Sequence, residues 1–243
     1  MYENFKYLDA VAQKEITNGV FSGSVLSVIH KGETVYLKSF GLADKEKNIP
    51  MKTDSIFRLF SMSKPVTAAA AMILIERGLL DTRHPLKWFI PEFSDPVVLD
   101  ENGERPADRD ITIGDLLTMT SGIPYPDGTP AGQKMGALWG EQSEKYLKGE
   151  KLLDTVSFAK EMGKRPLMFS PGEKWMYGAS ADIMGAVIEV VSGMKFGDFL
   201  RKEIFEPLGM NDTGFYILAE KYSRLAQCYD CLLYTSPSPR DCS

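Results

Sequence analysis

The sequence predicts a mixed α/β chain of the α+β kind, with an antiparallel hairpin near its N-terminus and a long helical region after it. Two short β-rich runs, 24–30 and 34–40, flank the pair Lys31-Gly32, which is typical of a hairpin turn. From about residue 85 to residue 205 the pattern indicates helices and loops. Strands that precede a block of helices favour a fold in which sheet and helices are segregated.

The expected elements follow one another in a simple order. Residues 3–19 have the apolar spacing of an amphipathic helix, and the hairpin comes next. A second helix is expected from Pro65 to Leu80, and it is apolar on nearly every side, which predicts a central, buried helix. Further helices are expected at 113–119, 152–162, 181–191 and 196–205, and a loop rich in Pro and Gly at 122–136.

The hairpin also predicts that part of the sheet lies outside this chain, because two strands alone are marginal in water. The end of the chain supports this interpretation, since residues 231–241 read like a translated transposase sequencing adapter. We therefore expect a partial domain over 1–230, with a helix and hairpin at 1–60 and a helical region at 61–217. Residues 231–243 are expected to be a non-native tail.

Composition narrows the class of function. The net charge of −5 argues against a nucleic-acid partner, and no run approaches the ~20 apolar residues that cross a bilayer. The N-terminus has no apolar signal region, which predicts the cytoplasm if Met1 is the true start, with the periplasm or the exterior left open. No zinc-spaced Cys/His set or phosphate-binding glycine loop occurs, so we expect no metal and no cofactor.

The three cysteines predict no disulfide framework. Cys228 and Cys231 have the spacing of a redox or metal pair, but Cys231 and Cys242 fall in the adapter-like tail. The two histidines, His30 and His84, fall in expected turns and have no acidic motif around them. A hydrolase built on this sequence would therefore need lysine or tyrosine as its base.

The motif Ser61-x-x-Lys64 provides such a pair. Residues three apart share one face of a helix, so the hydroxyl and the amine can meet. Two further S-x-x-K matches exist, Ser157/Lys160 on an expected solvated helix face and Ser192/Lys195 beside an expected helix C-cap. Only the first match precedes a helix with proline in its first turn. The alternative function of Ser61 is that of an ordinary N-cap.

Four ordered segments resemble the serine β-lactamase and penicillin-recognising enzymes, in their class C-like branch with its carboxylesterases and D-alanyl-D-alanine carboxypeptidases. The segments are 57–65 with the S-x-x-K motif, 113–122, 170–178 and 206–213. The resemblance implies a β-lactamase/transpeptidase-like fold with an antiparallel sheet, flanking helices and an all-helical subdomain. It implies that Ser61 attacks a carbonyl, that Lys64 takes or relays the proton, and that Tyr177 is a second base.

The chain departs from the family pattern at three points. Met119 stands where His is usual, and Ala179 stands where the Tyr-x-Asn motif has its amide. The third motif, normally on a late strand that gives an oxyanion N–H, is absent, and we therefore expect this chain by itself to be inactive. Esterase-like members often lack the Asn, which favours hydrolysis of small carboxylic esters by the full-length protein.

Three alternatives remain open at this point. They are D-alanyl-D-alanine carboxypeptidase activity, β-lactamase activity, and a penicillin-binding-like module that does not turn over. In each of them the partner is a small ester or amide, and the oligomeric state is left open.

Overall fold

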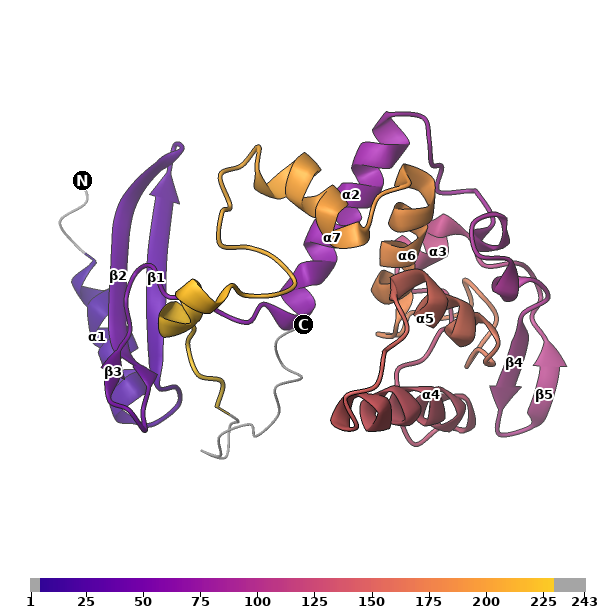
Figure 1. Ribbon diagram of the computed structural model, residues 1–243, viewed down its shortest axis with the longest axis horizontal. Coiled ribbons are helices and arrows are strands. Elements are labelled where there is room, and N and C mark those ends of the chain that lie inside the picture. Colours follow the sequence, from indigo (N-terminus) through magenta and orange to yellow (C-terminus); the bar gives the residue numbers. More distant parts are fainter. Residues whose placement is uncertain (1–4, 230–243) are drawn as a thin grey trace. The chain divides into compact units, whose positions relative to one another are not determined.

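The structure, a computed structural model, describes residues 5–229 and divides the chain into two compact units (Figure 1). The first unit comprises residues 1–60 and 212–243, and the second comprises residues 61–211. The adapter-like segment 231–241, with Cys231 and the expected tail up to residue 243, lies outside the described residues.

The first unit contains a three-stranded antiparallel sheet in the order β1-β2-β3, with one helix packed beside β2. Its elements are α1 (Lys6–Thr17), β1 (Gly23–His30), β2 (Glu33–Asp44) and β3 (Ile49–Pro50). The turn between β1 and β2 has Lys31 and Gly32 at φ 51° and 83°, as a tight two-residue hairpin turn requires. The predicted hairpin is therefore present.

The chain returns to this sheet at its last described residues. After the 3₁₀ turn η5 (Ala219–Arg224), Leu225 pairs in parallel with Ile56. The Gln227 N–H then donates to the Ala43 carbonyl at 2.7 Å. The buried apolar cluster here is small and consists of Ala43, Met51 and Ala226.

The second unit is helical apart from one short hairpin (Figure 1). Its longer elements are α2 (Ser63–Glu76), β4 (Val97–Asp100), β5 (Gly103–Pro106), α3 (Ile113–Leu117), α4 (Pro130–Leu147), α5 (Thr155–Gly163), α6 (Ser180–Ser192) and α7 (Phe196–Leu200). Short helical turns are η1 (Phe60–Met62), η2 (Leu86–Trp88), η3 (Pro91–Phe93) and the π-helical η4 (Arg201–Phe205), which continues α7.

Helix α6 is the centre of this unit. It contacts α2, α3, α5 and α7, and the side chains from Ile183 to Glu189 are all buried. It ends where the sequence predicts, because Gly193 adopts the left-handed conformation that closes a helix. The second unit therefore has a continuous core around one well-patterned helix.

Three expectations about the helical region are wrong. Residues 130–136 are the first turns of α4 rather than loop, since the Thr129 side chain caps this helix and Pro130 fits its first position. The hairpin β4–β5 was not expected from the sequence. Helix α2 is buried on one face only, with Met72 53% exposed, because α6 and α7 are the helices it contacts within its own unit. Among residues 5–229, no helix is long and apolar enough to cross a membrane.

Candidate active site

Ser61 lies in the 3₁₀ turn that leads into α2, two residues before the helix begins. The N-cap position belongs to Met62, and no side chain caps this helix. The hydroxyl of Ser61 is therefore not used as an N-cap. It is exposed and it is hydrogen-bonded to Lys64 and to Tyr177 instead.

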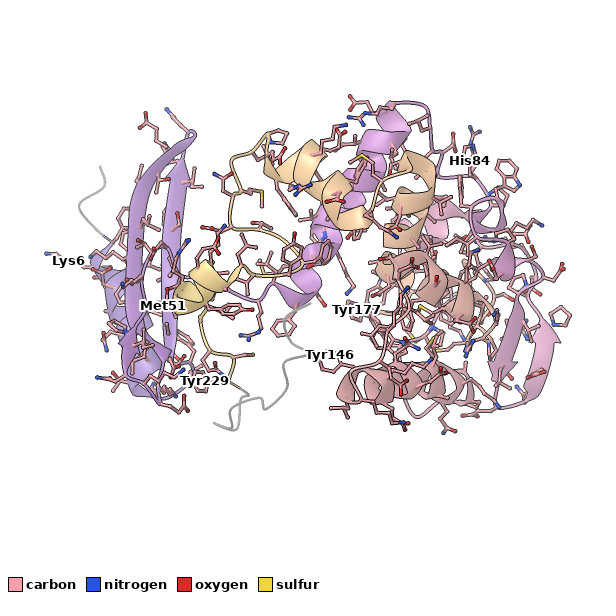
Figure 2. The ribbon with its side chains drawn as sticks, in the orientation of Figure 1. Lys6, Met51, His84, Tyr146, Tyr177 and Tyr229 are labelled. Carbon is pink, nitrogen blue, oxygen red and sulfur yellow. The ribbon has the colours of Figure 1, made fainter. Side chains whose placement is uncertain are left out.

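The structure brings the three sequence-predicted residues together. Lys64 Nζ donates to Ser61 Oγ at 3.2 Å, and Ser61 Oγ shares a short hydrogen bond with the Tyr177 hydroxyl. Lys64 Nζ also lies 4.5 Å from the centre of the Tyr177 ring. Figure 2 shows Tyr177 beside the N-terminal end of α2. One turn of helix thus supplies the nucleophile and the amine, and a distant loop supplies the phenol.

The charge of Lys64 favours the ionised form of Tyr177. The interaction with the Lys64 amine, followed by the hydrogen bond with Ser61, lowers the pKa of the Tyr177 phenol below its usual value. The nearby carboxylate of Asp182 acts weakly in the opposite direction. A lowered pKa makes the phenolate of a tyrosine more available, and a phenolate that contacts a serine hydroxyl can accept the proton of that hydroxyl.

The loop that carries Tyr177 is held by backbone hydrogen bonds to a second segment, 119–123. The Met176 N–H donates to the Met119 carbonyl at 2.9 Å, and the Ala179 N–H donates to the Ile123 carbonyl at 3.2 Å. Gly178 allows the segments to approach this closely. A Cβ at Gly178 would lie 2.1 Å from the Ile123 carbonyl oxygen. The Tyr177 backbone is therefore fixed by contacts on both of its sides.

The segment 119–123 is in turn anchored through the buried carboxylate of Asp115. Arg109 donates two hydrogen bonds to Asp115, at 2.7 and 2.8 Å, and the Thr120 hydroxyl donates a third at 3.0 Å. Thr112 completes a capping box with Asp115 at the start of α3. Burial raises the pKa of Asp115, but the hydrogen bonds from Arg109 and Thr112 outweigh burial, and the net pKa lies below its usual value.

Ala179, which occupies the position of the motif amide, is fully buried. It is the N-cap residue of α6, and no side-chain hydrogen bond caps this helix. The next residue, Ser180, shares a buried hydrogen bond of 2.8 Å with Ser121. The site therefore has no amide at this position.

Two residues of the site were not predicted from the sequence. Tyr125 lies in the loop after α3, and its hydroxyl donates to Asp182 in the first turn of α6 at 2.8 Å. Lys64 Nζ lies 5.6 Å from the centre of the Tyr125 ring. The one available signal was that Tyr125 falls inside the loop expected to line a site.

The other candidate residues form no comparable pair. Lys160 faces Glu92 at 3.7 Å, and Lys195 donates to Glu189 at 2.6 Å. His84 accepts a hydrogen bond from the Asp81 N–H and lies well away from Tyr177 (Figure 2). Among the S-x-x-K matches, the contacts thus distinguish the first one.

Comparison with known proteins shows the family of the chain. The family model described as Beta-lactamase matches residues 8–238 of the chain. The match overlaps the segment assigned to an adapter, and that assignment stays a prediction.

Two curated relatives are similar to the chain over most of its length. Esterase EstB of Burkholderia gladioli is 35% identical over 211 residues, which is 86% of this chain and 50% of EstB. Penicillin-binding protein 4* of Bacillus subtilis (strain 168) is 34% identical over 200 residues, 81% of this chain and 38% of that protein.

A solved structure is similar to the chain in its fold. The structure titled "EstCE1, a hydrolase with promiscuous acyltransferase activity" superposes with a TM-score of 0.78 at 28% identity, and it covers 96% of this chain and 58% of that one. The chain spans about half the length of the curated relatives it matches. Its fold is a portion of the β-lactamase/transpeptidase-like α+β architecture, and the chain belongs to the beta-lactamase family.

Proposed function

We propose that the protein is a serine hydrolase that cleaves small carboxylic esters through an acyl-enzyme, with Ser61, Lys64 and Tyr177 as catalytic residues. One observation carries the proposal. The hydroxyl of Ser61 is hydrogen-bonded both to an amine and to a phenol whose pKa is lowered. A serine hydroxyl is a weak nucleophile until a neighbouring base accepts its proton, and here the phenolate of Tyr177 can accept it while the charge of Lys64 stabilises that phenolate.

In the acylation step, Ser61 Oγ attacks the ester carbonyl carbon while its proton passes to the phenolate oxygen of Tyr177. The electron pair of the carbonyl bond moves onto the carbonyl oxygen. When this intermediate collapses, the bond to the alkoxy oxygen breaks, and the departing alcohol takes the proton from Tyr177. Lys64 remains hydrogen-bonded to Ser61 Oγ and stabilises the phenolate of Tyr177 by its charge.

Deacylation uses the same groups in the same order. A water molecule loses a proton to Tyr177 and attacks the acyl carbon. The bond between that carbon and Ser61 Oγ then breaks, the carboxylic acid leaves, and Ser61 regains a proton from Tyr177. Every proton transfer in this step passes between Tyr177, Ser61 and water.

Ester substrates are favoured over amides because the site has no amide at residue 179. A fully buried alanine cannot hydrogen-bond the amide group of a peptide or a β-lactam. Esterase EstB and EstCE1, two of the similar proteins, carry names that describe ester hydrolysis and acyl transfer. This agreement supports the proposed class of substrate.

The experiment is a burst assay with p-nitrophenyl acetate, made on the full-length protein. We expect one equivalent of p-nitrophenol in the burst, and a mass increase of one acetyl group on Ser61. Ser61→Ala should abolish both signals. Ser63→Ala is the matched control, since Ser63 lies two residues further on and its backbone carbonyl, which alanine keeps, accepts from the Thr67 hydroxyl. Turnover that survives in Ser61→Ala contradicts the proposal.

A second candidate is a penicillin-binding-like module that acylates without turnover. The similarity to penicillin-binding protein 4* is the observation that favours it. A fluorescent penicillin separates the two candidates. Permanent labelling of Ser61 with no ester turnover would favour the module, whereas ester turnover with no stable label would favour the esterase.

A further inference from the structure

Lys64 lies against two aromatic rings, of which only one belongs to the proposed catalytic set. Its Nζ is 4.5 Å from the ring centre of Tyr177 and 5.6 Å from that of Tyr125. The two rings are 5.9 Å apart and inclined at 46°. Because the face of an aromatic ring attracts a cation, Tyr125 provides a second surface that holds the ammonium group.

Tyr125 is itself fixed on two sides. Its hydroxyl donates to Asp182 Oδ2 at 2.8 Å, and its ring meets the Trp139 ring edge-on at 6.0 Å. Burial, followed by the charge of Asp182, raises the pKa of Tyr125. Tyr125 therefore keeps its proton over the working pH range and remains a hydrogen-bond donor.

Asp182 brings a negative charge to the same group of side chains. Four titratable groups act on one another here: Lys64 from α2, Tyr125 and Tyr177 from loops, and Asp182 from α6. Burial has the largest effect and raises the pKa of Asp182 above its usual value, although the hydrogen bond from Tyr125 and the charge of Lys64 act in the opposite direction. Asp182 and Lys64 act in opposite directions on the ionisation of Tyr177.

We propose that Tyr125 and Asp182 are positioning residues, which hold the Lys64 ammonium against Ser61 and Tyr177 and set the pH range in which Ser61 reacts. The inference rests on the proposed function of these three residues. The ring of Tyr125 holds the Lys64 ammonium group in position. Asp182 acts through its charge on Tyr177 and through its hydrogen bond on Tyr125.

Two substitutions at Tyr125 separate the ring from the hydroxyl. Tyr125→Phe keeps the ring beside Lys64, and we expect kcat to fall by no more than about threefold. Tyr125→Leu removes the ring, and we expect kcat to fall about tenfold or more with little change in KM, because the ammonium loses one of its supports. Equal loss in the two variants would overturn the role of the ring.

Asp182→Asn removes the charge and keeps an oxygen that accepts from Tyr125. Without the opposing negative charge, Lys64 favours the phenolate of Tyr177 more strongly. We expect the acidic limb of the kcat/KM profile to move to lower pH by about half a unit. Asp198→Asn is the matched control, since Asp198 lies in the first turn of α7 and pairs with Arg201. That variant should leave the profile unmoved.

A direct titration keeps this inference separate from the proposed function. In protein labelled with ¹³C at the tyrosine hydroxyl carbon, the Tyr177 resonance is identified by its loss in Tyr177→Phe. We expect its titration midpoint to fall in Asp182→Asn by the same half unit. An unshifted midpoint overturns the inference even if Ser61 is reactive. A shifted midpoint in a protein whose Ser61 does not react overturns the proposed function and leaves standing only the effect of Asp182 on Tyr177.

Discussion

At the scale of single residues, the absence of a side chain at Gly178 is as important to the site as the side chains around it. Gly178 lies between the phenol of Tyr177 and the buried methyl group of Ala179. Its Cα faces the Ile123 carbonyl oxygen so closely that any Cβ would overlap it. Since the atom in the way belongs to the backbone, the overlap can be relieved only by moving one of the two segments.

We expect Gly178→Ala to lower kcat about 100-fold, because a shift of the Tyr177 loop by about 1 Å misplaces the phenol relative to Ser61. The change in KM should be much smaller. Steady-state kinetics with p-nitrophenyl acetate would measure both. Gly140→Ala in α4 is the control, since its Cβ would enter open space and alanine is the better helix former. Unchanged kcat in Gly178→Ala would show that the loop adjusts freely.

At the scale of elements, the signals at the start of each helix decide whether the helix could be predicted from the sequence. The sequence could predict that Ser61, Lys64 and Tyr177 lie together, because a hydroxyl–amine spacing and ordered family segments point to them, and the structure places them in contact. Helix α4 could not be predicted, because it contains Gly132, Gly136 and Gly140, and glycine weakens a helical pattern. Its start depends on one threonine cap and one proline, signals that also occur in loops.

The elements next to the site depend on the ion pair of Arg109 with Asp115. Arg109→Met keeps the length of the side chain but leaves a buried carboxylate without its counter-ion. We expect the free energy of unfolding to fall by about 2 to 3 kcal/mol at pH 7, at the low end for a broken buried pair because Arg109 is 44% exposed. Urea unfolding of the complete protein would measure it.

The same pair should show a defined pH dependence. The folded pKa of Asp115 lies below its unfolded value, so its stabilisation is present above about pH 4 and is lost as pH falls through the folded pKa. The difference between wild type and Arg109→Met should therefore shrink in acid. Arg83→Met is the control, because Arg83 is 88% exposed and its pair with Asp81 should contribute less than about 1 kcal/mol.

At the scale of the whole molecule, the two units differ greatly in their cores. The cluster of the second unit extends through nearly all of its helices, with Leu74, Ile113 and Ile183 among its fully buried members. In the described part of the first unit, the cluster consists of three small or medium side chains, and Ile29 and Leu37 of the hairpin are exposed. A hairpin with so little burial is weakly stabilised.

We expect amide hydrogen exchange of the expressed 243-residue chain to reveal this difference. Peptides from β1 and β2 should exchange at least tenfold faster than peptides from α6, because local opening costs little where few apolar contacts are broken. Mass spectrometry of peptic fragments would measure both regions in one experiment. Equal protection would mean that the chain unfolds as one cooperative unit.

The fold class could be predicted from the hairpin and from α6, because the apolar residues of α6 recur at helical spacing and a glycine follows its last turn. The sequence could not predict which residues surround Lys64, since Tyr125 and Asp182 are 57 residues apart and meet only in the folded unit. Nor could it reveal that α2 is exposed at Met72. The burial of a helix depends on how many other elements pack against it, and the composition of the helix does not give that number.

The edge-on contact of Trp139 with Tyr125 has an optical consequence. Indole emission responds to the charges and rings around it, and Trp139 is also packed against Phe158 at 5.3 Å. It is thus a natural fluorophore, separated from Lys64 by a single tyrosine ring. Once the signals of Trp88 and Trp175 are removed by substitution with phenylalanine, the emission of Trp139 would follow ionisation and acylation in real time without a labelled substrate.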